Sequence, residues 1–234
     1  MAVRAQALPH DGLHELAGRT RPVAQAGEQV LPVLPCLASL LPWAGLRRGA
    51  TVAVTGPGAT SLALALLAAA SAAGSWAAAV GLPSLGMVAA AQVGVDLARF
   101  VMVAPGRDWP TAVAALVDAF DMVLVRPSGR PPAAAGRRLV ARARERGAVL
   151  LVHGPWEGAD LRLRIDGSVW QGLGQGYGHL RRRRVEVVGE GRGAAARAHR
   201  ARLWLPDDDG RPASVRGSPE HARAGPTAVG ARAG

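Results

Sequence analysis

Residues 51–67 read Thr-Val-Ala-Val-Thr-Gly-Pro-Gly-Ala-Thr-Ser-Leu-Ala-Leu-Ala-Leu-Leu. A β-branched strand runs into a Gly-Pro-Gly turn, and a long apolar helix follows the turn. This order places backbone N–H groups at a helix N-terminus, which is where many α/β proteins hold phosphate. The stretch therefore predicts an α/β fold built around a phosphate loop.

The loop lacks its expected cation. A nucleotide-binding loop follows the pattern G-x-x-x-x-G-K-[ST], in which lysine contacts the β- and γ-phosphates. Here Ala59 stands where the lysine is expected, and the turn is about two residues short of that pattern. The whole chain contains no lysine. The candidate loop residues are Gly56, Pro57, Gly58, Ala59, Thr60 and Ser61, and we expect them to bind no ATP and no other cofactor.

Continuous apolar runs alternate with helical patterns through the first two thirds of the chain. Such runs are typical of parallel strands whose two faces are both covered by helices. The expected strands are 51–55, 76–80, 100–103, 122–125 and 148–152, and the expected helices are 60–73, 84–94, 109–119 and 133–146.

The pattern then changes to alternation of polar and apolar residues. Residues 161–170, 184–188 and 200–205 show this period of two, which is typical of antiparallel strands with one exposed face. The predicted fold class is therefore α/β, with a mostly parallel central sheet flanked by helices and with terminal antiparallel strands.

Three segments are expected along the chain. Residues 1–30 form a helical segment outside the core, and residues 31–206 form the core. Residues 207–234 are rich in Gly, Pro, Ser and Ala, offer few apolar side chains to bury, and are expected to be a disordered tail.

Positive charge is concentrated in the second half. The net charge is +11, and residues 131–206 alone hold fifteen arginines against six acids. Such an excess favours an anionic partner, either nucleic acid or an acidic protein surface, although an ordinary solvated face has the same composition. The candidate basic surface consists of Arg181, Arg182, Arg183, Arg184, Arg200, Arg202 and Trp204. Trp204 alternates with Leu203 and Leu205, so we expect it on the opposite face of its strand.

Several kinds of site are not indicated. Cys36 is the only cysteine, and the six histidines have no metal-ligand spacing. The first residues show no signal peptide, and the apolar run at 62–80 is better explained by a buried helix and strand than by a membrane span. A cytoplasmic or nucleoid-associated protein is expected.

The order of elements resembles the core of RecA recombinases, over roughly residues 30–206. Residues 36–58 resemble the RecA entry into its phosphate loop, and Gln92–Asp96 resembles the stretch before the third RecA strand. Phe120–Val125 resembles the Walker B strand, and the late alternating strands resemble the terminal antiparallel strands of RecA.

The departures from the RecA pattern fall on its catalytic positions. Besides Ala59, Arg126 stands at the end of the Walker B strand, where an acid that organises the metal is expected. Residues 81–86 contain no acid where the family places its catalytic glutamate. The two connections that carry mobile DNA-binding loops in RecA are reduced to 126–132 and 153–160. We expect no ATPase activity.

A short RecA-like chain with degenerate motifs resembles the ImuA-type accessory proteins of GC-rich actinobacteria. That resemblance implies a non-catalytic adaptor in damage-induced translesion mutagenesis, with an ImuB-type Y-family polymerase homologue as its partner. Two alternatives stay open: a DNA-binding protein acting through its basic half, and a weak nucleotide-binding regulator.

Overall fold

A computed structural model describes residues 30–106, 108–129, 131–173 and 178–215. The expected N-terminal helical segment, apart from Val30, lies outside the described residues, as do residues 216–234 of the expected tail.

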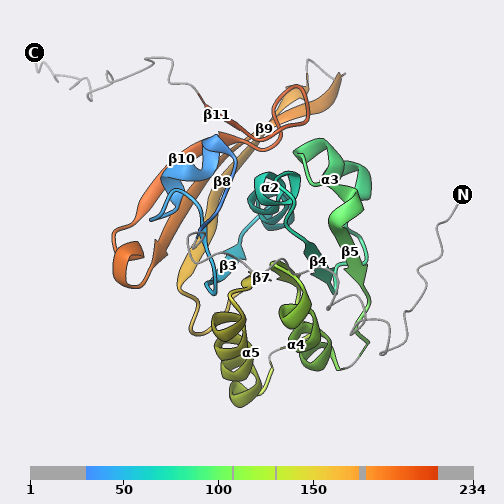
Figure 1. Ribbon diagram of the computed structural model, residues 1–234. Helices are drawn as coiled ribbons and strands as arrows, with labels where there is room; N and C mark the ends of the chain where they lie inside the picture. The colour runs from blue at the N-terminus through green and yellow to red at the C-terminus, as the bar shows by residue number, and fades with distance from the viewer. Residues whose placement is uncertain (1–29, 107, 130, 174–177, 216–234) are drawn as a thin grey trace, which may run out of the picture.

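The molecule is organised around one sheet with the strand order β11-β10-β9-β8-β3-β7-β6-β4-β5 (Figure 1). Strands β3 to β8 run parallel, and β9, β10 and β11 are antiparallel to their neighbours. The strands are β3 (Thr51–Thr55), β4 (Ala77–Val80), β5 (Phe100–Val103), β6 (Met122–Val125), β7 (Val149–His153), β8 (Leu161–Leu173), β9 (Gly178–Gly191), β10 (His199–Trp204) and β11 (Ala213–Ser214).

Helices cover both faces of the parallel strands, as the continuous apolar runs predict. Helices α2 (Ala59–Ala72) and α3 (Met87–Val93) lie on one face, and α4 (Trp109–Ala119) and α5 (Ala133–Arg146) lie on the other. Short elements complete the described chain: β1 (Val30–Leu31) pairs with β2 (Leu46–Arg47), and short 3-10 helices occur at η1 (Pro35–Leu40), η2 (Leu97–Arg99) and η3 (Gly193–Ala195).

The predicted fold class is confirmed, and the predicted helices and parallel strands lie within three residues of the observed ones. Strand β9 is much longer than the predicted 184–188, because the arginine run before Val185 hides the apolar period. Strand β8 begins where predicted and ends at Leu173 rather than at residue 170.

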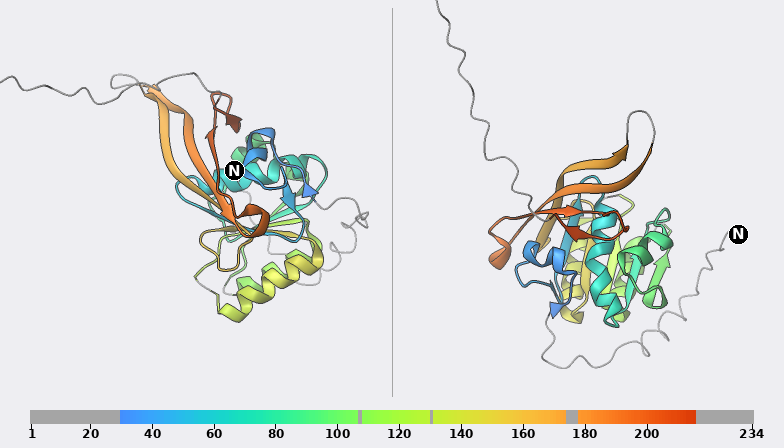
Figure 2. Two further views of the ribbon diagram at one scale, coloured as in Figure 1. Left: turned by 90° about the vertical axis from the view of Figure 1, so that its left-hand side faces the viewer. Right: turned by 90° about the horizontal axis from the view of Figure 1, so that it is seen from above.

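Strands β8 to β10 curl over α2, so that this helix is enclosed by the sheet on several sides (Figures 1 and 2). Val185, Val187, Leu203 and Leu205 from the curled strands join the same buried cluster as the leucines and alanines of α2. This explains why α2 is apolar around its whole circumference. It also brings β9 close to the N-terminus of α2.

Two aspartates close the amino end of the sheet. The Asp160 carboxylate accepts a hydrogen bond from the Thr51 N–H at 2.9 Å, at the first residue of β3. The Asp121 carboxylate accepts one from the Trp76 N–H at 3.0 Å, just before β4, and pairs with Arg48 at 2.9 Å. These backbone groups would otherwise have no strand partner.

The predicted tail boundary at residue 206 is wrong for residues 207–215. The Asp207 carboxylate accepts hydrogen bonds from the N–H groups of Asp209 and Arg211, which makes a local turn. Strand β11 then pairs with β10 at Leu203 and Trp204. A polar composition typical of disorder here forms a side-chain-stabilised turn and an edge strand.

Candidate functional site

The candidate phosphate loop is a tight turn. Only Gly56, Pro57 and Gly58 separate β3 from α2. Both glycines have a φ of +95°, a conformation that favours glycine. The Ala59 N–H donates to the Gly56 carbonyl at 3.1 Å, so the turn uses one of its own donors internally. The short turn leaves less backbone to surround a phosphate than the full-length pattern provides.

Arg183 of β9 lies directly against this turn. Its side chain is only 8% exposed, and a Cβ built on Gly58 would lie 2.6 Å from its Nη1. Its Nε donates to the Leu205 carbonyl at 2.8 Å, and its guanidinium lies 5.1 Å from the ring centroid of Trp170. Burial lowers the pKa of the Arg183 guanidinium, although arginine keeps its proton at neutral pH. A cation supplied by β9 therefore occupies the neighbourhood of the missing lysine.

Strand β8 crowds the other glycine. A Cβ on Gly56 would lie 3.1 Å from the Ile165 backbone nitrogen and would overlap the Ile165 carbonyl oxygen. Ile165 is therefore the lateral neighbour of Gly56, one step beyond the Thr55–Arg164 pair of β3 and β8, while Arg183 of β9 lies against Gly58.

The hydroxyl position after the turn is engaged by a histidine. Thr60 Oγ1 lies 3.1 Å from Nε2 of His153, at the end of β7. Desolvation lowers the pKa of His153, and the charge of Arg126 lowers it further, so the ring is neutral near neutral pH. Ser61 is half-buried, and Arg126 is exposed at the end of β6.

The antiparallel strands present a face of arginines. The register of β8, β9 and β10 places six of them on the face opposite the α2 cluster. We call this surface the arginine face; it consists of Arg162, Arg164, Arg182, Arg184, Arg200 and Arg202, together with Trp204.

Half of these arginines are neutralised by neighbours. Arg164 pairs with Asp166, Arg182 pairs with Asp208 at 3.0 Å, and Arg200 pairs with Glu186 at 3.7 Å. Within the described residues, Arg162, Arg184 and Arg202 form no ion pair. Three arginines of the face therefore form no ion pair there, and one of them, Arg162, lies opposite Glu190 in the β8–β9 register.

Two of the predicted surface residues do not belong to this face. Arg183 points to the opposite side, into the turn, and Arg181 lies exposed near the free end of the β8–β9 hairpin. Trp204 lies on the face opposite Leu203 and Leu205, as predicted, but is half-buried. The Arg182 guanidinium lies 4.4 Å from its ring centroid.

Sequence reasoning missed Arg162 and Arg164 as surface members. The alternation Leu161-Arg-Leu-Arg-Ile165 contained the signal, because a period of two places both arginines on one face. It missed the free end of the hairpin as well. There the large side chains of Leu173 and Leu180 are exposed, and the hairpin projects from the body (Figure 2).

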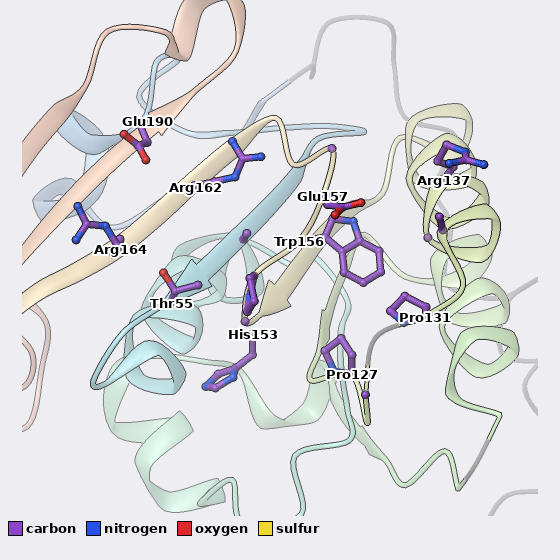
Figure 3. A pocket seen from close by; sticks show the side chains of 17 residues that line it. Thr55, Pro127, Pro131, Arg137, His153, Trp156, Glu157, Arg162, Arg164 and Glu190 are labelled. Atoms are coloured by element: carbon purple, nitrogen blue, oxygen red, sulfur yellow. The ribbon is translucent and has the colours of Figure 1, made fainter.

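A pocket of about 840 Å³ lies where the arginine face meets α5, at the carboxyl ends of β3 and β7. Figure 3 shows Arg162 and Arg164 on the strand side, Arg137 on the helix side, and Trp156 between them. Thr55, His153, Pro127, Pro131, Glu157 and Glu190 also line the pocket.

The described residues contain neither a candidate metal site nor a candidate membrane-spanning helix. Across the described ranges, no three histidine, cysteine or acidic side chains lie together in a way that would hold a metal ion. In the same part of the chain, no helix has the length and apolar character needed to cross a membrane.

Comparisons with known proteins agree with this architecture. The model of a family described as the MT3502 N-terminal domain matches residues 39–158. An uncharacterised protein of Mycobacterium tuberculosis, Rv3395c, is 43% identical over 109 residues, which are 45% of this chain and 53% of that protein. The chain thus spans about half the length of this curated relative.

The crystal structure of the RadB recombinase matches 77% of this chain and 97% of that chain. The TM-score is 0.56 and the sequence identity 18%. At that identity the likeness shows the fold, which is RecA-like.

Proposed function

The chain belongs to the MT3502 N-terminal domain family, and from that premise we propose that it is a non-catalytic RecA-like accessory protein of translesion mutagenesis. In this role it is an adaptor for a Y-family polymerase homologue of the ImuB type. The uncharacterised relative and the RecA-like fold are compatible with the proposal but assign no role.

One observation carries the non-catalytic part of the proposal. Both glycines of the turn that would hold phosphates lie against the chain's own later strands, Gly58 against the Arg183 side chain of β9 and Gly56 against the Ile165 backbone of β8. Phosphoryl transfer depends on charge neutralisation by a lysine and a metal held by acids. Ala59, Arg126 and the acid-free segment 81–86 supply none of these groups. The residues present therefore do not fit ATP.

The adaptor part rests on the arginine face. Three arginines that form no ion pair within the described residues and a half-buried tryptophan lie on one exposed sheet surface, outside the segment that the family model matches. Aromatic and arginine side chains are the commonest hot spots of protein interfaces. Charges at such a surface also speed the encounter with an acidic partner.

The experiment is co-purification with the polymerase homologue encoded nearest to this protein's gene. Replacing Arg202 and Trp204 together with alanine is expected to weaken binding by about 2 kcal/mol or more. Arg138→Ala on α5 is the matched control, because Arg138 is an exposed arginine away from the arginine face. Circular dichroism checks the fold of each variant. Full binding by a folded double variant would contradict the proposed interface.

The nucleotide-free part is tested separately by thermal unfolding with and without Mg-ATP. We expect no shift in the melting temperature and no phosphate release with DNA present. A rise that Arg183→Ala abolishes would mean that Arg183 replaces the missing lysine as a phosphate ligand. That result would favour the nucleotide-binding regulator.

A second candidate function, DNA binding, is favoured by the same three arginines. Phosphate contacts of this kind are independent of sequence and weaken steeply with salt. If the protein is chiefly a DNA binder, oligonucleotide affinity falls on replacing Arg162, Arg184 and Arg202, and polymerase binding does not.

A further inference from the structure

The pocket beside α5 has arginines on two opposite sides and an apolar region between them. The strand wall carries Arg162 and Arg164 of β8, and the helix wall carries Arg137 of α5 (Figure 3). Trp156 and the ring of Pro131 lie against Gly136 of α5, at 3.6 and 3.8 Å from a Cβ built there. One region of the pocket is therefore apolar, and its rim carries charge.

Two of the rim cations lack a partner. Neither Arg137 nor Arg162 forms an ion pair within the described residues, whereas Arg164 is paired with Asp166. Arg162 is half-buried and lies opposite Glu190 in the β8–β9 register, whereas Arg137 is exposed on α5. Such cations on opposite sides of a cavity favour a ligand with separated negative charges.

The apolar wall is held rigidly. Trp156 is 7% exposed and packs edge to face against Trp109 of α4, with ring centroids 6.3 Å apart. Its Nε1 is buried and has no hydrogen-bond partner among the described residues. A preformed aromatic wall favours an apolar side chain, because little conformational freedom is lost when the wall is covered.

Acids in the lining distinguish between anionic ligands. Glu157 and Glu190 line the same pocket. A nucleic acid strand brings a phosphate at every nucleotide, so its charges cannot avoid Glu190. A peptide can place its acidic side chains opposite the arginines alone, and it presents N–H donors and apolar side chains elsewhere.

We propose that this pocket binds an acidic, extended peptide segment of a partner protein. An apolar side chain of the segment packs on Trp156, and carboxylates on either side pair with Arg137 and Arg162. The inference rests on the proposed adaptor function and adds to it the chemistry of the partner segment.

The test is fluorescence anisotropy of a labelled peptide of alternating Asp and Leu residues, titrated with the full chain. Replacing Arg137 and Arg162 together with glutamine is expected to raise Kd about tenfold or more, since both charge pairs are lost. Arg138→Gln is the matched control on the same helix and should leave Kd unchanged. Gly136→Leu places its side chain beside Trp156 and Pro131 and should block the peptide while keeping the charges.

Three further probes complete the design. A peptide of alternating Asp and Ser tests the apolar anchor, one of alternating Lys and Leu tests the charge, and oligothymidylate tests nucleic acid. We expect the first two to bind about tenfold more weakly or worse, and the oligonucleotide not to compete. Equal binding of the Asp–Ser peptide, or competition by oligothymidylate that depends on Arg137 and Arg162, would overturn the proposal.

The pocket and the adaptor role can fail independently. If the polymerase homologue binds the Arg137 and Arg162 double variant at full strength, the pocket proposal is overturned and the adaptor role stands. If the peptide binds as expected but no polymerase homologue does, the adaptor role fails and the pocket keeps its assignment.

Discussion

The parallel and antiparallel halves of the sheet differ in almost every physical property. Residues 51–130, which hold most of the parallel half, carry four arginines and four acids, whereas residues 161–215 carry eleven arginines and six acids. Strands β3, β4, β6 and β7 are buried on both faces, the edge strand β5 is partly exposed, and β8 to β10 are buried on one face. The family model matches residues 39–158 and ends just before β8. One half therefore forms the scaffold, and the other forms the exposed surface and closes the phosphate loop.

The largest expected effect comes from comparing a side chain of each half. Leu151 of β7 is fully buried between β3 and β6. Arg202 of β10 is exposed and forms no ion pair within the described residues. Leu151→Ala should lower the free energy of unfolding by about 2–5 kcal/mol. Arg202→Gln should change it by less than about 0.5 kcal/mol. Urea denaturation followed by circular dichroism measures both, and similar losses would contradict the division into scaffold and surface.

The contact between the halves gives the second prediction. Gly58→Ala places a Cβ at a positive φ and against Arg183, so we expect a loss of about 1–3 kcal/mol of stability. Arg183→Ala removes the steric part of that loss. The double variant should therefore be more stable than the sum of the single losses by about 1 kcal/mol. Additive losses in the denaturation cycle would mean that Arg183 does not press on the turn.

A smaller effect is expected at the outer edge of the antiparallel half. Truncation after Pro206 removes β11 and the Asp207 turn, and should lower stability by about 1–2 kcal/mol through lost hydrogen bonds. Truncation after Val215 is the control, because it keeps both β11 and the Asp207 turn. Thermal unfolding compares the two. An unchanged melting temperature after the shorter truncation would mean that the edge strand contributes nothing.

The smallest expected effect is a change in pH dependence at the parallel half. Desolvation holds the pKa of His153 below its ordinary value of 6.5, so the unfolded chain binds a proton first as the pH falls. The fold therefore loses stability below about pH 6.5, and His153→Gln removes that part of the loss. Melting temperatures between about pH 7 and pH 5 measure it. A variant with the same slope as the parent would assign the loss to other groups.

The local sequence was sufficient to predict those strands and helices whose bounds depend only on their own residues. The parallel strands are continuous apolar runs, and α5 ends at Gly147 as its sequence predicts. The pairing of distant residues could not be read in this way. Arg183 belonged to a run of four similar residues, and only the register of β9 decides that it alone points into the turn. The aspartate contacts at Thr51 and Trp76 are equally non-local.

The pocket was missed for a related reason. Its walls come from segments far apart in the chain, and each of them reads as an ordinary loop or surface helix on its own. Only the sheet order, with β8 beside β3, brings Arg162 opposite Arg137. The signal present in the sequence was the alternation of β8, which gives the face of Arg162 but not its neighbours.

The pairing between β3 and β8 has a mechanical consequence. The two strands run parallel from Val52 and Leu161 to Thr55 and Arg164, and Asp160 just before β8 also accepts a hydrogen bond from the Thr51 N–H. A partner that pulls on the projecting hairpin along its strands loads these hydrogen bonds in shear, so they share the force and must break together. A pull across the strands would peel them one at a time. The β3–β8 pairing therefore resists a force along the strands more strongly than a force across them.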